Sequence, residues 1–322
     1  MASAHVLASS PDTVHWGYFD AALPPALLVD SGDLVEIHTV NGQRRDLQDL
    51  PFELLPEHQA ILESCTPRLG PHIVTGPIGV RGAERGDVLE VRVMEVALRQ
   101  DWGWNAMRPL RGSLPEDFAT TRVLHIPIDR ANMLARLPFG PALPLRPFFG
   151  IMAVAPPPEY GAVGTIEPRE YGGNIDNKEL GAGSTVFFPV HAPLALFSAG
   201  DGHAVQGDGE VNLTALETAL SGKFELHLHK GVSLRMPLAL TPTDVITMGF
   251  HEDLDTAARQ ALREMISLLS SSQGWQPEDA YAFCSMACDL RITQMVDGNK
   301  GVHAVVRRSL LGEIRPAHFR RP

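Results

Sequence analysis

The sequence has 322 residues with a formal charge of -11, from 38 acidic and 27 basic side chains, and 44% of its residues are hydrophobic. This composition is typical of a globular protein with enough apolar material for a core, and the length favours about two domains. The acidic balance argues against a nucleic-acid partner, which would need clustered Lys and Arg, and no apolar run approaches the ~20 residues of a membrane span.

Glycine and proline are plentiful, at 29 and 26 residues, and they divide the first half of the chain into short segments that suit strands and loops. Strands are expected where apolar residues alternate or cluster between turn residues, at 26–29, 34–40, 88–96 and 149–154, with another beginning at Gly76. We expect a short helix within 51–64, interrupted by Pro56, and one helical segment at 129–137.

A loop at 156–169 predicts a loose boundary between a β-rich region, 1–165, and an α+β region, 166–322, that carries the catalytic motifs. The second region is expected to contain strands at 186–190 and 224–230, helices at 253–271 and from Pro277 to about Cys288, and a hairpin of 291–296 with 302–306. The predicted fold is therefore α+β and predominantly β, with sandwich- or barrel-like sheets and a few helices in the C-terminal third.

Cysteine usage indicates a reducing compartment. The chain has three cysteines, Cys65, Cys284 and Cys288, and an odd, sparse count is not a disulfide framework. Cys284 and Cys288 share a face of an expected helix, where a metal or redox pair and two small buried side chains both fit the spacing. We predict a cytoplasmic location.

The stretch from Gly172 to Glu210 is the most informative part of the chain. It has polar, metal-capable side chains at both ends and an apolar, strand-like run between them. Its glycines are interleaved with Asp, His, Asn, Gln and Glu, and glycine is the residue that tolerates positive φ and close approach to a ligand. These loops therefore have the pattern of backbone shaped around a bound group.

The side chains of this stretch suit a metal site. Asp201 and His203 are two residues apart and project from one face of an extended segment, and Asp176 would supply a third ligand, leaving a position open for water. Imidazole and carboxylate favour zinc or another first-row divalent ion, which activates bound water near neutral pH. The alternative is a pair of plain turns, in which the aspartates cap backbone amides.

Other side chains of the stretch have candidate roles around that ion. Glu210 and Asp208 are candidates to move protons, and Lys178 is a candidate to stabilise a developing oxyanion. Asn174 and Gln206 are candidates to hold an amide carbonyl or amine.

The motifs together resemble the acetamidase/formamidase family. The central motif is the most specific part of the likeness, which covers nearly the whole chain and matches the shorter branch of the family. The segments that carry it are Gly172–Lys178, Gly183–Thr185, Gly200–Glu210, His72–Ile78, Gly82–Asp87, His15–Asp20, Phe148–Gly150, Asp289–Gln294 and Asp297–Gly298.

This resemblance implies a hydrolase of small linear amides that releases a carboxylate and ammonia, on a mostly β scaffold and as a homo-oligomer, a dimer or larger. It also implies a bound divalent metal, for which we expect zinc, with a second ion such as calcium left open. His72 and Asp20 stand at matching positions, so His72 is a further catalytic candidate and Asp20 a substrate-binding one. The alternatives are a larger or cyclic amide (a lactam) as substrate, a covalent amidase that uses Ser184 or a cysteine, and a non-catalytic ligand-binding protein.

Overall fold

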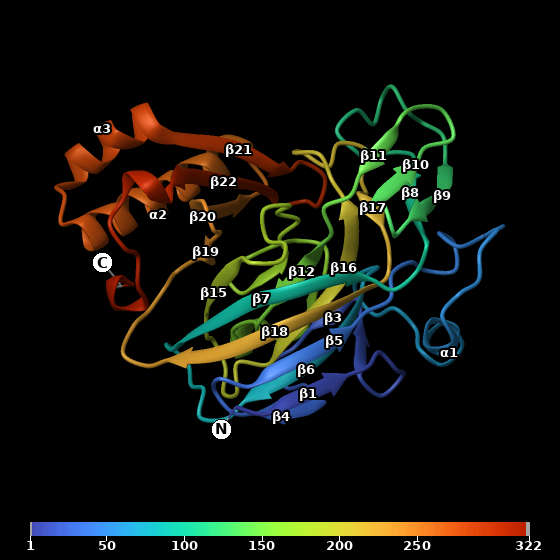
Figure 1. Cartoon of the computed structure of the whole chain (residues 1–322), viewed down its shortest axis with the longest axis horizontal. Coiled ribbons are helices and arrows are strands. Elements are labelled where there is room, and N and C mark those ends of the chain that lie inside the picture. The colour runs from blue at the N-terminus through green and yellow to red at the C-terminus, as the bar shows by residue number, and fades with distance from the viewer. Residues whose placement is uncertain (1, 320–322) are drawn as a thin grey trace.

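The computed structural model describes residues 2–319 and contains two large β-sheets (Figure 1). Strands account for 38% of the chain and helices for 15%, which confirms the predominantly β fold expected from the sequence. Within the described residues neither sheet closes into a barrel.

The first sheet has nine strands, and all neighbouring pairs are antiparallel except β1 with β5. In spatial order they are β1 (Ala4–Leu7), β5 (Leu34–His38), β18 (Leu220–His229), β7 (Val88–Leu98), β15 (Thr185–Pro189), β19 (Leu238–Leu240), β20 (Asp244–His251), β22 (Lys300–Arg307) and β21 (Cys288–Gln294).

The second sheet has eleven strands, and its centre is β16. Its main path is β11 (Ala142–Pro144), β10 (Leu134–Arg136), β9 (Arg122–Asp129), β8 (Trp102–Met107), β17 (Leu216–Glu217), β16 (Phe197–Val205), β12 (Phe148–Ala153) and β14 (Gly172–Asn174). The remaining strands are β6 (Ile73–Val80), which pairs with β16, and β2 (Val14–Trp16) and β4 (Leu27–Val29), which pair with β6. A separate small sheet pairs β3 (Tyr18–Phe19) with β13 (Val163–Gly164).

The main core lies between the two large sheets. Phe224 of the first sheet packs against Phe149 and Phe197 of the second, with ring centroids 5.3 and 5.6 Å apart, and all three side chains are buried. Both sheets contain strands from either side of the boundary expected near residue 165. In the first sheet, for example, β18 lies between β5 and β7. The distant halves of the chain therefore meet in one core.

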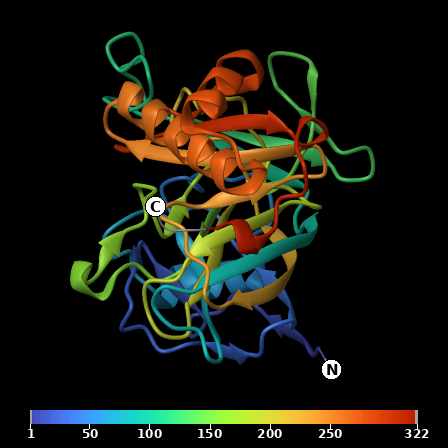
Figure 2. The ribbon, with the colours of Figure 1, turned by 90° about the vertical axis from the view of Figure 1, so that its left-hand side faces the viewer.

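Two of the three α-helices in residues 2–319 lie together beside β20, β22 and β21, at one edge of the first sheet (Figures 1 and 2). They are α2 (Leu254–Gln273) and α3 (Pro277–Ala287). The Asp253 carboxylate caps the first turn of α2, and Gly274 ends it in the left-handed conformation. Gly249 of β20 lets α2 approach closely, because a Cβ there would lie 2.2 Å from the Ala257 carbonyl oxygen. None of the helices in residues 2–319 is both long and apolar enough to cross a membrane.

Two local expectations need correction. Residues 129–137 are not helical, because Asp129 accepts a hydrogen bond from the Asn132 backbone and turns the chain into a hairpin of β9 with β10. Pro56 does not interrupt the early helix but begins it, since α1 (Pro56–Ser64) has this proline in its first turn, where a missing N–H costs nothing. Short 3₁₀ turns lie at Pro158–Tyr160, Arg308–Leu310 and Pro316–His318.

Candidate functional site

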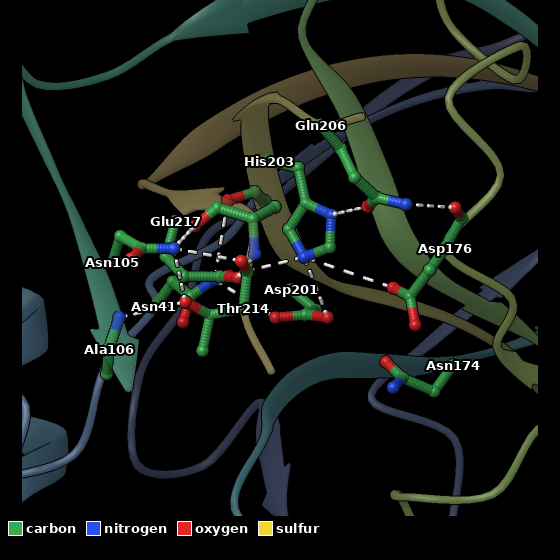
Figure 3. A network of polar contacts seen from close by, with 12 residues as sticks. Asn41, Asn105, Ala106, Asn174, Asp176, Asp201, His203, Gln206, Thr214 and Glu217 are labelled. Carbon is green, nitrogen blue, oxygen red and sulfur yellow. Dashed lines mark hydrogen bonds and ion pairs between the residues drawn. The ribbon is translucent and has the colours of Figure 1, made fainter. Parts of the chain in front are cut away.

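Five carboxyl side chains and one imidazole gather around β16, and each is less than 10% exposed. The members of this acidic cluster are Asp176, Asp201, His203, Glu210, Glu217 and Asp297. Asp201 and His203 lie on β16 itself and Glu217 on β17, whereas the other three come from loops that follow β14, β16 and β21. Residues from four parts of the chain thus share one polar region. Figure 3 shows four of its members, Asp176, Asp201, His203 and Glu217.

His203 lies at the centre of this cluster. Its Nε2 is 3.1 Å from Asp201 Oδ2, 3.3 Å from Glu217 Oε2 and 3.9 Å from Asp176 Oδ1. The sequence predicted that the carboxylate of Asp201 and the imidazole of His203 project from the same face of an extended segment, and the structure confirms it. Asp176 approaches the same nitrogen from a separate loop. The three-residue set of Asp176, Asp201 and His203 stays a prediction, because the groups whose ligand atoms lie within 4.8 Å of one another place Asp176 and Asp201 in different sets.

Gln206 determines which ring nitrogen of His203 carries a proton and which has a lone pair available. Its amide nitrogen donates to the backbone carbonyls of Asp176, at 2.8 Å, and Thr293, at 3.4 Å, so its Oε1 must be the atom 2.9 Å from His203 Nδ1. An amide oxygen only accepts, so Nδ1 carries a proton and donates to it. Nε2 is then the nitrogen that can offer a lone pair to a metal ion, and it is the one that faces the carboxylates.

Three of the clustered acids have an unusual backbone conformation. Asp176, Asp201 and Glu210 have φ values of 53°, 54° and 46°, which place them in the left-handed region. Such a residue costs on the order of 1 kcal/mol or more relative to an ordinary conformation, and it persists only where surrounding structure imposes it. Here the Asp176 N–H donates to the Gly150 carbonyl at 3.1 Å. The strain is concentrated at the residues whose side chains converge.

Gly150 of β12 leaves the space into which those side chains point. It lies in the ladder between the pairs Phe149–Gly202 and Ile151–Gly200, which places it opposite Asp201. A Cβ at Gly150 would be 2.6 Å from Asp176 Oδ1 and 2.7 Å from both Asp201 Oδ2 and His203 Cε1. Any other residue would therefore occupy the point where the two carboxylates and the imidazole face one another.

The residues present fit a divalent metal ion. Two sets of three have candidate ligand atoms within 4.8 Å of one another: Asp176, His203 and Glu210, and Asp201, His203 and Glu217. Both oxygens of Asp176 are buried without a hydrogen-bond partner among the described residues, a costly state that a cation would relieve. The two sets share one imidazole, and a single Nε2 lone pair binds only one ion.

Burial and mutual repulsion disturb the titration of the acids. Burial raises the pKa values of Asp176 and Glu210 well above their ordinary range, and nearby carboxylates raise them further. Burial also raises the pKa values of Glu217 and Asp297 to about 7, although the charge of His203 opposes it. Acids so close together need shared protons or a cation.

His203 and Asp201 behave as an ion pair within this cluster. Burial lowers the pKa of His203, but the charges of Glu217 and Asp201 outweigh it and raise the pKa well above its usual value. Burial raises the pKa of Asp201, but the charge of His203 and its hydrogen bond to the carboxylate oppose this and hold the pKa below its usual range. In the absence of a metal ion the imidazole thus supplies the positive charge that the acids require.

A cavity of about 450 Å³ opens onto the cluster. Asp201, Glu210, Glu217 and Asp297 line its buried end, together with Asn174. The Asn174 amide nitrogen donates to Asp297 Oδ2 at 3.0 Å, which leaves its Oδ1 buried without a partner among residues 2–319. This free acceptor is suited to bind an N–H of a ligand.

His72 also lines the cavity. Its Nδ1 lies 3.0 Å from the Thr165 hydroxyl oxygen. Burial lowers its pKa, with the charge of Asp201 opposing, so the ring is neutral near pH 7. It therefore lies where it could meet a ligand, and its catalytic role stays a prediction from the family resemblance.

Two sequence-predicted candidates lie elsewhere. The Lys178 ammonium pairs with Asp208 at 3.0 Å, and neither residue lines the cavity. Asp20 accepts a hydrogen bond from the Ala22 backbone at 2.9 Å in a turn, and it also lies outside the cavity lining. The structure thus brings together Asn174, Asp176, Asp201, His203, Gln206, Glu210 and His72 but not Lys178 or Asp20.

Sequence reasoning missed three contributors: Glu217, Asn41 and the site role of Asp297. The Asn41 amide nitrogen donates to Glu217 Oε2 at 2.7 Å and Asp201 Oδ1 at 3.1 Å, so it orients both carboxylates. Asn41 and Glu217 stand in segments without any local motif, so no sequence signal marks them. In the sequence, the Asp297–Gly298 pair stands out only as part of the family likeness.

Comparisons with known proteins identify the family of the chain. The model of the acetamidase/formamidase family matches residues 9–162 and 159–306. The formamidase of Methylophilus methylotrophus is 30% identical over 200 residues, which are 46% of this chain and 49% of that protein, so the match spans about half of the relative's length.

Solved structures match over nearly the full chain. A predicted acetamidase/formamidase from Thermoanaerobacter tengcongensis superposes with a TM-score of 0.85 at 27% identity, over 96% of this chain and 97% of the other. The acetamidase from Bacillus halodurans gives a TM-score of 0.82 at 27% identity, over 96% and 100% of the two chains.

Proposed function

Because this chain belongs to the acetamidase/formamidase family, we propose that it is a metal-dependent hydrolase of linear amides, which it converts to a carboxylate and ammonia. One observation carries this proposal: a buried imidazole faces three carboxylates, two of which, Asp201 and Glu217, line a cavity that is also lined by Asn174, whose amide oxygen is unpartnered within residues 2–319. The names of the matched relatives support an amide as the class of substrate, and the imidazole and carboxylate side chains support a bound metal ion.

We assign His203, Asp176 and Asp201 as metal ligands and zinc as the ion. When bound there, a divalent ion acts as a Lewis acid that lowers the pKa of water and polarises an amide carbonyl. Gln206 orients the imidazole through its Nδ1 proton, and Asn41 orients Asp201. A second ion, such as calcium, would have to be held by carboxylates alone, since His203 offers one nitrogen.

The remaining residues have roles in binding and proton transfer. Asn174 Oδ1 accepts a hydrogen bond from the substrate amide nitrogen. Glu210 takes the proton from the attacking water and delivers it to the nitrogen as the C–N bond breaks, a role suited to a carboxyl group whose pKa is raised. His72, which is neutral, is a second proton carrier at the cavity wall.

Ammonia release tests the proposal. The purified protein should hydrolyse members of a panel of formamide, acetamide, larger linear amides and lactams, lose activity on chelation and regain it with zinc. Elemental analysis should find bound metal. Full activity in metal-free protein would refute the metal role, and a preference for lactams would favour the cyclic-amide alternative.

Three variants separate ligands from the proton carrier. Asp176→Asn and Asp201→Asn should lose metal and activity together. Glu210→Gln should keep its metal and lose activity by about 1,000-fold, in the range that general acid–base catalysis contributes. Loss of metal from Glu210→Gln would instead make Glu210 a ligand, as its grouping with Asp176 and His203 allows.

Two properties of the whole protein complete the proposal. We expect a homo-oligomer, as in the family resemblance, and light scattering in solution measures its mass. The cytoplasmic location rests on the three cysteines, all of which are free thiols in the structure.

A further inference from the structure

The cavity is larger than the smallest amides require. A water molecule takes up about 30 Å³ in the liquid, so the four non-hydrogen atoms of acetamide fill on the order of 100 Å³. The cavity holds about 450 Å³, within the range of pockets that enclose much larger ligands. A substrate that fills it extends well beyond the amide group.

The two ends of the cavity differ in charge. The buried end carries the acidic cluster, whereas four arginines line the remainder: Arg45, Arg68, Arg108 and Arg111. Arg45, Arg68 and Arg111 are exposed, which places them at the mouth. The chain as a whole has a net charge of -11, whereas the cavity mouth is rich in positive charge. The mouth therefore attracts anions even though the rest of the protein repels them.

Arg68 and Arg111 are the arginines available to a ligand. Arg108 forms an ion pair with the buried Asp46, and Arg45 lies 3.9 Å from the same carboxylate. Neither Arg68 nor Arg111 has an ion-pair partner within residues 2–319. Free guanidinium groups at a cavity mouth suit an anion, and their paired N–H donors match a carboxylate.

Both free arginines are held near the site by ordered loops. The Arg68 guanidinium stacks 4.8 Å from the centre of the Tyr18 ring, four residues before His72 in a loop that lines the cavity. Arg111 lies two residues before Ser113, whose N–H donates to the Val211 carbonyl at 2.8 Å and ties this loop to the 211–214 segment. The fold therefore places the backbone of both arginines beside the cavity, and the ring of Tyr18 also positions the side chain of Arg68.

The wall between the two ends is partly apolar. Ile166, Leu213, Val296 and Trp104 line it, and the Trp104 indole N–H is buried without a partner among the described residues. Such a wall suits a short hydrocarbon segment with a polar group nearby. Among residues 2–319, none from the first turn of an α-helix lines the cavity, so the usual backbone site for a phosphate is not part of it.

We propose that the natural substrate is a linear primary amide that also carries a carboxylate, a dicarboxylic acid monoamide. The inference rests on the proposed amidase function. The amide lies at the acidic end, where a neutral group avoids repulsion, and the carboxylate binds Arg68 and Arg111 at the mouth. Water adds its oxygen to the amide carbon, the C–N bond breaks, and the products are a dicarboxylate and ammonium.

A series of amides tests this substrate class. Oxamate, malonamate, succinamate and glutaramate place zero to three methylene groups between amide and carboxylate, and each is compared with the uncharged amide of equal length. At least one member should have a kcat/KM about tenfold above its uncharged counterpart, and added salt should reduce that ratio. Equal values across the whole series would overturn the proposal.

Two variants and a matched control locate the preference. Arg68→Gln and Arg111→Gln should each lower the charged-to-neutral ratio of kcat/KM by about fivefold or more. Arg263→Gln, an exposed arginine on α2, should leave the ratio unchanged. A ratio that neither mouth variant lowers would show that the preference has another origin and refute the assignment.

Calorimetry separates this inference from the amidase proposal. Succinate and glutarate, the products of two test amides, should bind the metal-loaded protein, and Arg68→Gln and Arg111→Gln should weaken that binding. If no amide is hydrolysed but this binding holds, the amidase function fails while the carboxylate site stands. If amides are hydrolysed with neither carboxylate preference nor arginine-dependent product binding, only the further inference fails.

Discussion

Replacing Gly150 by alanine adds one methyl group where the candidate ligands converge. The new Cβ would lie 2.6 Å from Asp176 Oδ1 and 2.7 Å from Asp201 Oδ2 and His203 Cε1. Optimal non-bonded contact needs roughly 3.5 Å, so each of these contacts must lengthen by nearly 1 Å. Gly150 does not have a positive φ, so its backbone tolerates alanine and the effect comes from the side chain alone.

The expected loss is large for so small a change. A misplacement of about 1 Å in a catalytic constellation costs about 100-fold in rate, and overpacking a tight interior costs about 1–3 kcal/mol of stability. Gly150→Ala should therefore bind less metal and lower kcat/KM for amide hydrolysis by about 100-fold. Elemental analysis, ammonia release and thermal unfolding measure the three effects.

Gly207→Ala is the matched control. Gly207 lies in the same glycine-rich segment as the ligands, but a Cβ there meets nothing within 4 Å, and its φ is not positive. It should behave like the unmodified protein in all three assays. If Gly150→Ala matched it in metal content and rate, the idea that this glycine leaves room for the converging ligands would be wrong.

Three further outcomes follow from the same geometry. Gln206→Ala should weaken metal binding by about 10- to 100-fold, measured by competition with a chelator, while Gln206→Glu, which keeps an acceptor, should retain more of it. In metal-free protein the free energy of unfolding should fall as the pH rises from about 4 to 7. The folded-state pKa values of Glu217 and Asp297 lie above their unfolded values of 4.5 and 3.8. The folded state therefore binds more protons than the unfolded state in that window, and raising the pH removes this stabilisation. A flat profile in thermal unfolding would contradict this. Lys178→Met should change kcat/KM by less than about threefold, since the ammonium pairs with Asp208 outside the cavity, and a loss of 100-fold would restore its predicted catalytic role.

The sequence by itself determined the elements whose pattern is local. Alternation predicted the strands from 88 to 96 and from 224 to 230, and helical spacing predicted α2, because each pattern reflects which face of one element is buried. The glycine-rich motif likewise placed His203 next to Asp201, since two residues on one strand share a face without help from the rest of the fold.

Only the tertiary structure decided which distant side chains join that pair. Glu217 and Asp297 reach the cluster because β17 pairs with β16 and the loop after β21 folds over the cavity, and no local pattern encodes such pairings. The role of Gly150 depends on its position opposite Asp201 in the ladder of β12 with β16. Lys178 belongs to the glycine-rich motif, but its ammonium pairs with Asp208. Tertiary packing, and not the local sequence, sets the direction of this side chain.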